Sequence, residues 1–316
     1  MATPLILWTV PVALGLPWIA FQVLTKLGYP PALAGEDVHK RDHTRVPKLG
    51  GTVFLIGILP ALAIAYHVTG LRVIIVAAGM ISLIYAIGLY DDIRGYGGSH
   101  RPTRWKLLKL FIPAVAAAPV LFVPVPPLFG LPEYVPFQNS LLAITYVMVC
   151  GNLLNIYSYY NGHSVSIALL CLVAILLRGP LDSGLFLVSF ISAAGLASVL
   201  PLHWVPARVF PGDSGDYTWG FLLGFLLVGG GNSWGGLVLL LPLILNFVIV
   251  MTWLMVPNGI PFARHGTIDA EGYIVAPNPV PIPWLLPYYL RLREQTTVLL
   301  LLLVQVPFAI AFVLLV

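Results

Sequence analysis

Repeated apolar runs of about 20 residues, the length that crosses the hydrocarbon core of a membrane as a helix, extend along most of this chain. Hydrophobic residues make up 59% of its 316 residues, a larger apolar share than soluble domains have. Because backbone groups in lipid must hydrogen-bond internally, and the runs lack the alternation of barrel strands, we expect helices. The sequence therefore predicts an all-α polytopic membrane protein that forms a single domain over residues 1–316.

The apolar runs predict ten transmembrane helices. The first run has no basic n-region and no small-residue cleavage site, which distinguishes it from a signal peptide. Two of the runs, 164–178 and 217–231, are short for a span, and we expect neighbouring helices to shield them. The predicted spans are 4–25, 50–66, 73–90, 108–126, 139–156, 164–178, 184–202, 217–231, 235–256 and 296–316.

The basic residues gather on one side of the predicted membrane. If every span crosses, that side holds all of the 16 Lys and Arg residues except Arg72 and Arg178. The positive-inside bias makes this side cytoplasmic and places both termini on the opposite side. The loops on the cytoplasmic side are 26–49, 91–107, 157–163, 203–216 and 257–295.

The first polar cluster on this side is "GEDVHKRDHTRVPKLGG", residues 35–51. One interpretation is a solvated loop that obeys the positive-inside rule. The other is a phosphate or headgroup site in which Lys40, Arg45 and Lys48 are the donors beside a glycine pair.

The second cluster is "GLYDDIRG", where Asp91 and Asp92 end the third span. Adjacent carboxylates at a membrane boundary repel each other and lose solvation unless a cation offsets them. Mg²⁺ suits such a place because it uses a few carboxylates together with substrate phosphates. Simple solvation of a helix end is the alternative interpretation.

The third cluster is "GNLLNIYSYYNGHS". Asn152 and Asn155 are three residues apart, so on a helix they share a face, and Asn161 with Gly162 forms a turn. The amides have two interpretations: hydrogen bonds between helices, or oxygen ligation of a metal and hydrogen bonds to a sugar.

The fourth cluster is "PGDSGD", residues 211–216. Its glycines predict a turn in which the Asp213 carboxylate can reach a metal ion. Asp216 is predicted to start the next span, where an acid suits a helix N-terminus. Arg264 and His265 in "PFARHGTID" add polar groups from the last cytoplasmic loop.

Taken in order, these motifs resemble one known family, the polyprenyl-phosphate N-acetylhexosamine-1-phosphate transferases. The similarity extends over nearly the whole chain and is greatest to the eukaryotic and archaeal branch, the UDP-GlcNAc–dolichyl-phosphate GlcNAc-1-phosphotransferases. That resemblance also implies about ten spans with catalytic loops on the cytoplasmic face. The matching segments are "VPKLGG", "DDIRG", the Asn-x-x-Asn…Asn-Gly order of 152–162, "RVFPGDS", "ARHGT" and "LREQTTVLLLLLVQ".

The resemblance implies roles for individual residues. Asp213 matches a Mg²⁺ ligand, with Mn²⁺ as an alternative ion, and Asn155 lies beside it. Asp91 and Asp92 match the acidic pair near the metal and phosphates, so these two and Asp213 are the catalytic candidates. Asn152 and Asn161 match residues of the nucleotide-sugar pocket, Arg264 matches an arginine that binds the diphosphate or sugar, and Lys106 matches a lysine that follows the acidic pair. With Lys40, Arg45 and His265 from the polar clusters, these are the substrate-binding candidates.

The chain departs from the bacterial branch of the family at two places. The bacterial phospho-MurNAc-pentapeptide translocase has Asp-Gly where this chain has Ser158-Tyr159, and it has a run of histidines that is missing at 264–266. Both differences argue against a peptidoglycan substrate. The last cytoplasmic loop is also shorter than is usual in the eukaryotic enzyme, which favours an archaeal type.

The resemblance implies transfer of N-acetylglucosamine-1-phosphate, or a related hexosamine-1-phosphate, from a UDP-sugar to a polyprenyl or dolichyl phosphate, with release of UMP. This reaction is the first step of lipid-linked oligosaccharide assembly for N-glycosylation. The implied partners are the UDP-sugar, the lipid phosphate and the bilayer, without nucleic acid and with a homodimer left open. The implied location is an archaeal plasma membrane or ER membrane.

Two other classes of membrane protein compete with this hypothesis. A transporter or channel for a phosphorylated solute would place ionisable residues near the bilayer midplane, often on interrupted helices. Here the interiors of the predicted spans hold no charge, and the polar groups collect at one end. The hypothesis of a structural membrane subunit does not explain why the chain has four polar clusters on one side of the membrane.

Overall fold

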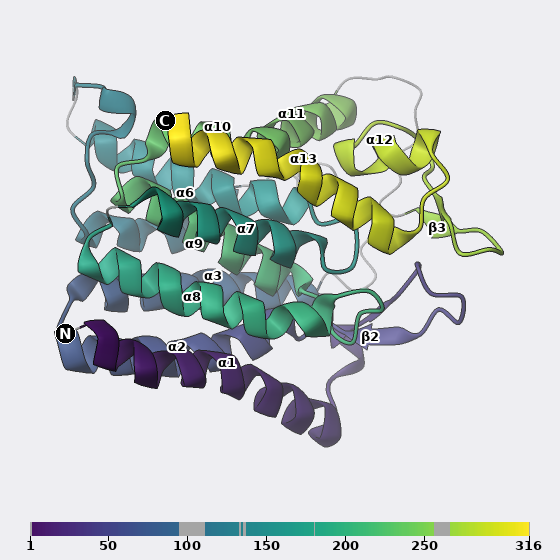
Figure 1. The fold of residues 1–316 in the computed structure, drawn as a ribbon, viewed down its shortest axis with the longest axis horizontal. Helices are drawn as coiled ribbons and strands as arrows, with labels where there is room; N and C mark the ends of the chain where they lie inside the picture. The colour runs from purple at the N-terminus through teal and green to yellow at the C-terminus, as the bar shows by residue number, and fades with distance from the viewer. Residues whose placement is uncertain are drawn as a thin grey trace.

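The protein is a bundle of helices that run side by side along one direction (Figure 1). The computed structural model describes residues 2–94, 111–132, 134, 137–179, 181–255 and 266–315. Within these residues, strands are confined to two short hairpins in the loops. The prediction of a mainly helical membrane protein is confirmed.

Between residues 138 and 255 the helices follow one another with short connections. Among the described residues, three helices are short 3₁₀ helices: η1 (Pro31–Leu33), η2 (Ala118–Phe122) and η3 (Leu128–Gly130). The α-helices are α1 (Ala2–Leu27), α2 (Gly50–Thr69), α3 (Arg72–Arg94), α5 (Pro113–Ala117), α6 (Gln138–Ile156), α7 (His163–Arg178), α8 (Ser183–His203), α9 (Gly212–Gly229), α10 (Ser233–Leu239), α11 (Leu241–Met255), α12 (Ile282–Tyr289) and α13 (Glu294–Leu315).

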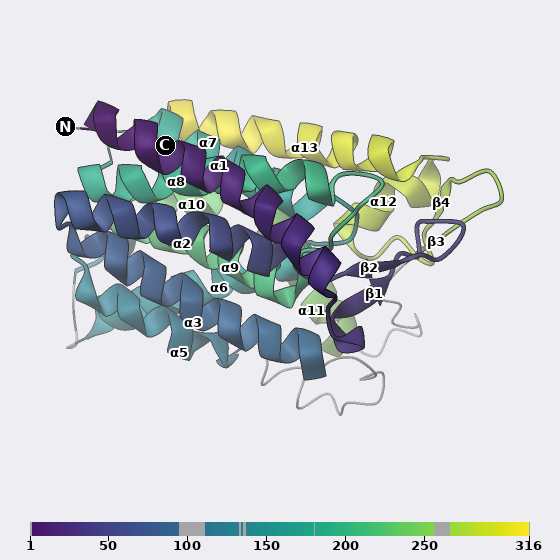
Figure 2. The same ribbon diagram turned by 90° about the horizontal axis from the view of Figure 1, so that it is seen from below.

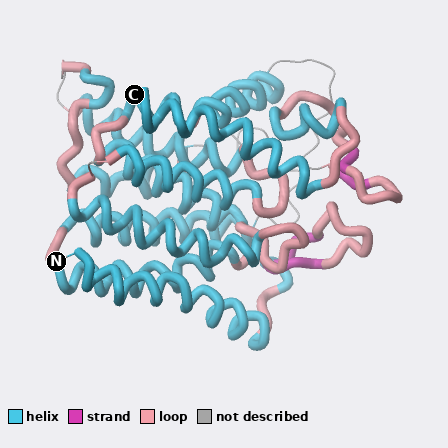
Figure 3. Tube along the Cα trace, in the orientation of Figure 1, coloured by secondary structure: helices cyan, strands magenta, loops and turns pink. Residues whose placement is uncertain are grey.

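Both hairpins lie at one end of the bundle. In the first, β1 (Ala34–Glu36) pairs antiparallel with β2 (Arg45–Pro47), and in the second β3 (Thr267–Ile268) pairs with β4 (Ile274–Val275). Figure 3 shows these strands in magenta at the right, whereas α1 begins and α13 ends at the left. The turned view of Figure 2 keeps this separation. The two hairpins and the chain ends therefore lie at opposite ends of the bundle, and the side of the membrane that each end faces stays a prediction.

Among the described residues, six helices are long and apolar enough to cross a membrane, and a seventh span is added if α10 and α11 count as one. The six are α1, α2, α3, α6, α8 and α13. The predicted spans 108–126, 164–178 and 217–231 correspond, where described, to the shorter helices α5 with η2, α7 and α9. The chain is therefore an integral membrane protein, and the count of ten stays a prediction.

The predicted span 235–256 is not one continuous helix. Helix α10 ends at Leu239, α11 begins at Leu241, and the two are bent by 72°. Pro242 gives the physical reason, because its ring removes one N–H donor and crowds the carbonyl group four residues earlier. The predicted span 235–256 therefore corresponds to a bent pair of helices, and its crossing of the membrane stays a prediction.

Helix α9 forms the centre of the bundle. It packs along α6 on one side and α3 on another, and its residues from Ser214 to Val228 are buried. The shielding that we expected for the short span 217–231 is therefore confirmed. This buried helix also begins at the end of the bundle that holds the hairpins, which places its first turn beside the polar loops (Figure 1).

Candidate active site

The first turn of α9 places Asp213 against the last turn of α6. The Asn155 side chain donates a hydrogen bond from Nδ2 to Asp213 Oδ1, at 2.8 Å. The two residues are 58 positions apart in the sequence, so the packing of α9 along α6 brings them together. The structure thus joins the two residues that the family resemblance assigns to a metal ion.

Asp92 holds the first turn of α9 from the end of α3. The backbone N–H of Asp213 donates to Asp92 Oδ1 at 2.9 Å, and that of Ser214 donates to Asp92 Oδ2 at 3.0 Å. N–H groups in the first turn of a helix lack partners within that helix, and a negative charge there is favourable. Asp92, a residue of α3, therefore caps the N-terminus of α9. Both of its oxygens serve to position Asp213.

Asp91 faces another direction from Asp92. Consecutive residues of an α-helix point about 100° apart. Asp92 is only 4% exposed, whereas Asp91 keeps a larger exposed surface. The acidic pair therefore divides into a buried residue that contacts α9 and a more accessible one at the end of the bundle.

Gly88 allows α3 to approach α9 closely. A Cβ atom built on Gly88 would lie 2.5 Å from the Cα of Ser214 and 2.7 Å from its backbone N. Gly88 is one turn before Asp92, so this approach brings the Asp92 carboxylate to the N–H groups of α9. Gly212 completes the contact, because it has φ of +69° and a Cβ there would lie 2.5 Å from Asp92 Oδ2.

We expect Gly88→Ala to lower thermal stability in detergent, by about 1–3 kcal/mol, because the added methyl group would overlap the backbone of α9. Gly79→Ala is a matched control on the same helix, since a Cβ there would meet nothing within 4 Å. Alanine is favoured over glycine in a helix by roughly 1 kcal/mol, so the control should keep or raise the melting temperature. Equal melting temperatures for the two variants would contradict the close α3–α9 packing.

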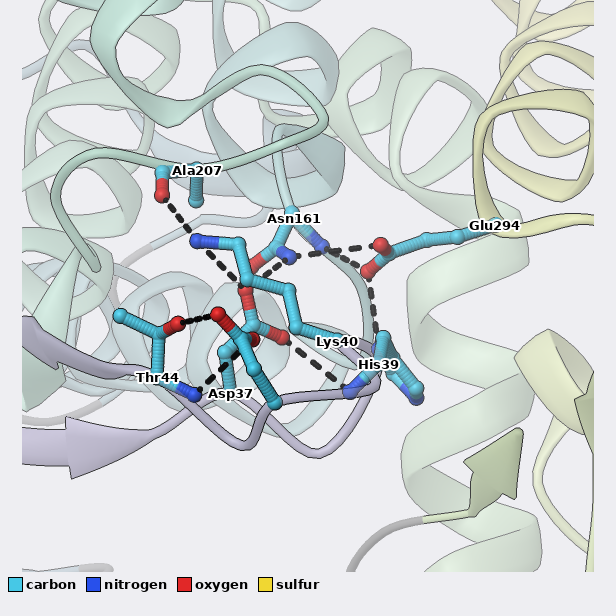
Figure 4. Close-up of polar contacts among 8 residues, drawn as sticks. Asp37, His39, Lys40, Thr44, Asn161, Ala207 and Glu294 are labelled. Carbon is cyan, nitrogen blue, oxygen red and sulfur yellow. Dashed lines mark hydrogen bonds and ion pairs between the residues drawn. The ribbon is translucent and has the colours of Figure 1, made fainter. Parts of the chain in front are cut away.

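Two predicted phosphate donors brace the loop of the first hairpin. Lys40 Nζ donates to the Ala207 carbonyl at 2.8 Å and lies 3.4 Å from Asp37 Oδ2 (Figure 4). Arg45 Nη2 donates to the carbonyl groups of Pro31 and Ala34, at 3.2 and 3.3 Å. The Lys40 contact connects the loop to the segment that leads into α9, whereas the Arg45 contacts hold it to η1 and β1. Substrate binding by Lys40 and Arg45 stays a prediction.

Of the two predicted asparagines in the nucleotide-sugar pocket, Asn152 is buried in α6. Its Nδ2 donates to the Met148 carbonyl at 2.9 Å, four residues earlier on the same helix. Asn161 follows α6 and belongs to a second polar cluster with Asp37 and Glu294 (Figure 4). Three other predicted substrate-binding residues, Lys106, Arg264 and His265, lie outside the described residues.

For the segment 211–216, one expectation is confirmed and one is corrected. Gly212 shows the positive φ and the close approach expected of the glycines, although α9 already begins there and Asp213 lies in its first turn. Asp216 is therefore beyond that turn, and it is buried at 5% exposure, not placed at a helix N-terminus. The physical reason is the cap from Asp92, which lets the helix start several residues before the apolar run.

The residues at this place fit a magnesium ion. Mg²⁺ takes oxygen ligands and keeps several waters or substrate phosphates, so it needs few protein groups. Asp213 supplies a carboxylate, and Asn155 supplies an amide that offers its oxygen once the group is rotated. Within the described part of the chain, no three His, Cys, Asp or Glu residues gather as a closed metal cage. Asp213 and Asn155 would leave the remaining positions around the ion to water and substrate phosphates.

Comparison with known proteins agrees with this geometry. The model of the family described as glycosyl transferase family 4 matches residues 74–231, which is half of the chain. The matched region contains Asp92, Asn155 and Asp213, the residues that meet at the start of α9. The chain belongs to glycosyl transferase family 4.

Several named relatives are similar over longer stretches of the chain. A protein of Sulfolobus acidocaldarius is 27% identical over 76% of this chain and 74% of its own length. One from Saccharolobus solfataricus is 25% identical, over 75% and 74%. Both carry the provisional name UDP-N-acetylglucosamine–dolichyl-phosphate N-acetylglucosaminephosphotransferase. The decaprenyl-phosphate N-acetylglucosaminephosphotransferase of Mycolicibacterium smegmatis is 30% identical over 60% of this chain and 50% of its own. The family resemblance of the motifs is confirmed.

Proposed function

We propose that this member of glycosyl transferase family 4 transfers N-acetylglucosamine-1-phosphate from UDP-GlcNAc to a polyprenyl phosphate of the dolichyl type and releases UMP. The observation that carries the proposal is the Asp213–Asn155 pair, fixed by Asp92 at the start of a buried helix. The names of the relatives supply the sugar, the nucleotide and the lipid phosphate. The product is the first intermediate of lipid-linked oligosaccharide assembly.

In this reaction a non-bridging oxygen of the lipid phosphate attacks the β-phosphorus of the UDP-sugar. The bond from that phosphorus to the oxygen shared with the α-phosphate breaks, and UMP leaves with the oxygen. The second pKa of a phosphate monoester is about 6, so near pH 7 the acceptor is already largely dianionic. A strong general base is therefore not required, and catalysis depends on positioning and charge screening.

The residues of the chain hold and orient the reactants. A divalent cation on Asp213 and Asn155 would supply charge neutralisation for the donor diphosphate. Asp92 keeps Asp213 in place through the backbone of α9. Asp91, more exposed than Asp92, is the group we propose to accept a proton from an acceptor phosphate that arrives singly protonated.

A panel of substrates tests this function directly. Purified full-length protein in detergent would receive Mg²⁺, a polyprenyl phosphate and, in turn, UDP-GlcNAc, UDP-N-acetylgalactosamine or UDP-glucose. We expect UMP release that requires both UDP-GlcNAc and the lipid phosphate. Release of UDP in place of UMP would overturn the proposal. UMP release that does not depend on the lipid phosphate would also overturn it.

The proposed orientation puts the hairpin end of the bundle in the cytoplasm. Single cysteines at Glu36 and Glu271 would report on the two hairpins, and one at Tyr134 would report on the opposite side. The native Cys150 and Cys171 are buried, so background labelling should be low. In intact cells an impermeant maleimide should label Tyr134→Cys alone. Labelling of Glu36→Cys and Glu271→Cys from opposite sides of the membrane would contradict the proposed topology.

A transporter remains the alternative function. Its sites would lie near the middle of the bundle. The paired groups found here lie at the end of α3, the end of α6 and the start of α9. This collection at one end favours an enzyme that meets its substrates at the membrane surface.

A further inference from the structure

Asn161 is held by two carboxylates that come from distant parts of the chain. Its Nδ2 donates to Asp37 Oδ2 at 3.1 Å and to Glu294 Oε2 at 3.3 Å, while its backbone N–H donates to Glu294 Oε1 at 2.9 Å (Figure 4). Glu294 Oε1 also pairs with His39 Nδ1 at 2.8 Å. We refer to Asp37, His39, Asn161 and Glu294 as the Asn161 clamp.

The clamp is buried, although its members are polar. Asp37 is 2% exposed, Glu294 7% and Asn161 8%, and the His39 side chain is 5% exposed. Buried polar groups are unfavourable unless they are hydrogen-bonded, so each contact of the clamp restrains the others. Glu294 is the first residue of α13 and Asp37 lies between β1 and β2. The clamp therefore ties the last membrane helix and the first hairpin to the segment after α6.

Nearby contacts hold the same segment. Burial raises the pKa of the Tyr160 hydroxyl, which stays neutral and donates to the Pro283 carbonyl of α12 at 3.0 Å. Lys40 links Asp37 to the Ala207 carbonyl, in the segment that leads to Asp213. The position of Asn161 is thus fixed relative to the elements that build the active site.

The clamp also decides which way the Asn161 amide points. An ionised carboxylate offers only acceptors, whereas an amide has a donating nitrogen on one side and an accepting oxygen on the other. Asp37 and Glu294 both require the NH₂ group, so the amide oxygen is turned away from them. A freely rotating asparagine would offer either group to a ligand, and this one offers its oxygen.

We propose that Asp37 and Glu294 are positioning residues for the donor substrate, which set Asn161 so that its amide oxygen accepts a hydrogen bond from an N–H group of the nucleotide-sugar. The proposal rests on the proposed function and adds to it a cause of donor selectivity. Two groups of UDP-GlcNAc carry such an N–H: the imide of uracil and the acetamido group of the sugar. The common chemistry is a neutral N–H donor.

Charge-neutral variants of the clamp test this role. Asp37→Asn and Glu294→Gln keep the side-chain shapes but add donors, so the Asn161 amide loses its fixed orientation, most completely in the double variant. We expect the KM for UDP-GlcNAc to rise about fivefold or more in the double variant, the scale of one hydrogen bond. The kcat and the KM for polyprenyl phosphate should change less than about twofold, since neither depends on this contact.

The matched controls are Asp42→Asn and Glu271→Gln. These remove the same charges from exposed residues: Asp42 shares the first hairpin with Asp37, and Glu271 lies in the second hairpin. Both controls should keep the wild-type KM. Thermal melting in detergent of all variants would show whether the fold is kept, and each single variant remains informative if the double variant unfolds.

Two donor analogues identify the N–H group. UDP-glucose lacks the acetamido group, and UDP-GlcNAc methylated on the imide nitrogen of uracil lacks the other N–H. In calorimetric binding to the wild type, at least one analogue should have a raised Kd relative to UDP-GlcNAc, and in the double variant that difference should shrink. The analogue that behaves so identifies the source of the hydrogen bond.

The proposal is wrong if the double variant keeps the wild-type KM for UDP-GlcNAc, or if both differences between analogues persist unchanged. It is also wrong if kcat, both KM values and the melting temperature change together, because that pattern means a structural role alone. Should the wild type release no UMP, the proposed function fails by itself. Calorimetric binding of UDP-GlcNAc to wild type and variants then tests the clamp independently.

Discussion

Asp213→Asn is expected to lower UMP release by at least about a hundredfold while the protein stays folded. The substitution keeps the shape of the side chain and one oxygen, but it removes the negative charge that would hold a cation at the donor phosphates. Loss of one strong electrostatic contact in an active site typically has an effect of about this size. UMP release from UDP-GlcNAc, with thermal melting in detergent alongside, measures both halves of the expectation.

Asp182→Asn is the matched control for this variant. Asp182 Oδ1 accepts from the backbone N–H groups of Gly184 and Leu185, at 2.8 and 2.9 Å, and so caps α8. Asparagine caps helices about as well as aspartate, so activity should stay near wild type. Asp216→Asn is a poor control because Asp216 is buried in α9. If Asp213→Asn keeps more than about half of the wild-type activity, the metal-ligand assignment is wrong.

Removal of divalent metal with EDTA is expected to abolish the transfer. Asp91, Asp92 and Asp213 lie at the same end of the bundle, and the reaction adds a donor diphosphate and a lipid phosphate to them. So many negative groups repel one another unless a cation screens them. Mg²⁺ matches the oxygen ligands that Asp213 and Asn155 offer.

The control for the EDTA experiment is the return of metal. Excess Mg²⁺ should restore UMP release, and Mn²⁺ should restore at least part of it. Mg²⁺ together with UMP should also raise the melting temperature of the wild type, and this increase should be smaller in Asp213→Asn. Full activity in metal-free buffer would show that the site works without a cation.

The sequence was sufficient to predict the long apolar helices and the proximity of Asn155 and Asp213. Long apolar runs form helices in a membrane, because their backbone groups must hydrogen-bond internally. This is why the sequence could place α1, α2, α3, α6, α8 and α13. The pairing of Asn155 with Asp213 followed from a motif order that family members share. The break before Pro242 was also visible in principle, since proline inside an apolar run marks a bend.

Other features depend on packing that no local pattern shows. Asp91 and Asp92 are equal in sequence, and only the contact of α3 with α9 makes Asp92 the cap of α9. The same cap lets α9 start at Gly212, before its apolar run begins. In the sequence, Asp37 and Glu294 do not differ from other acidic residues of polar loops. Their shared partner Asn161 is 124 and 133 positions away from them, so no local pattern connects the three residues.

The fate of the donor's two phosphates tests the central claim most directly. UDP-GlcNAc would be radiolabelled in the β-phosphate in one sample and in the α-phosphate in another, and each would be incubated with wild-type protein, Mg²⁺ and polyprenyl phosphate. We expect the β-label in the lipid extract and the α-label in the aqueous phase as UMP. In Asp213→Asn, neither labelled product should form. If both labels stay in the aqueous phase while the sugar enters the lipid, the protein transfers a sugar and not a sugar phosphate.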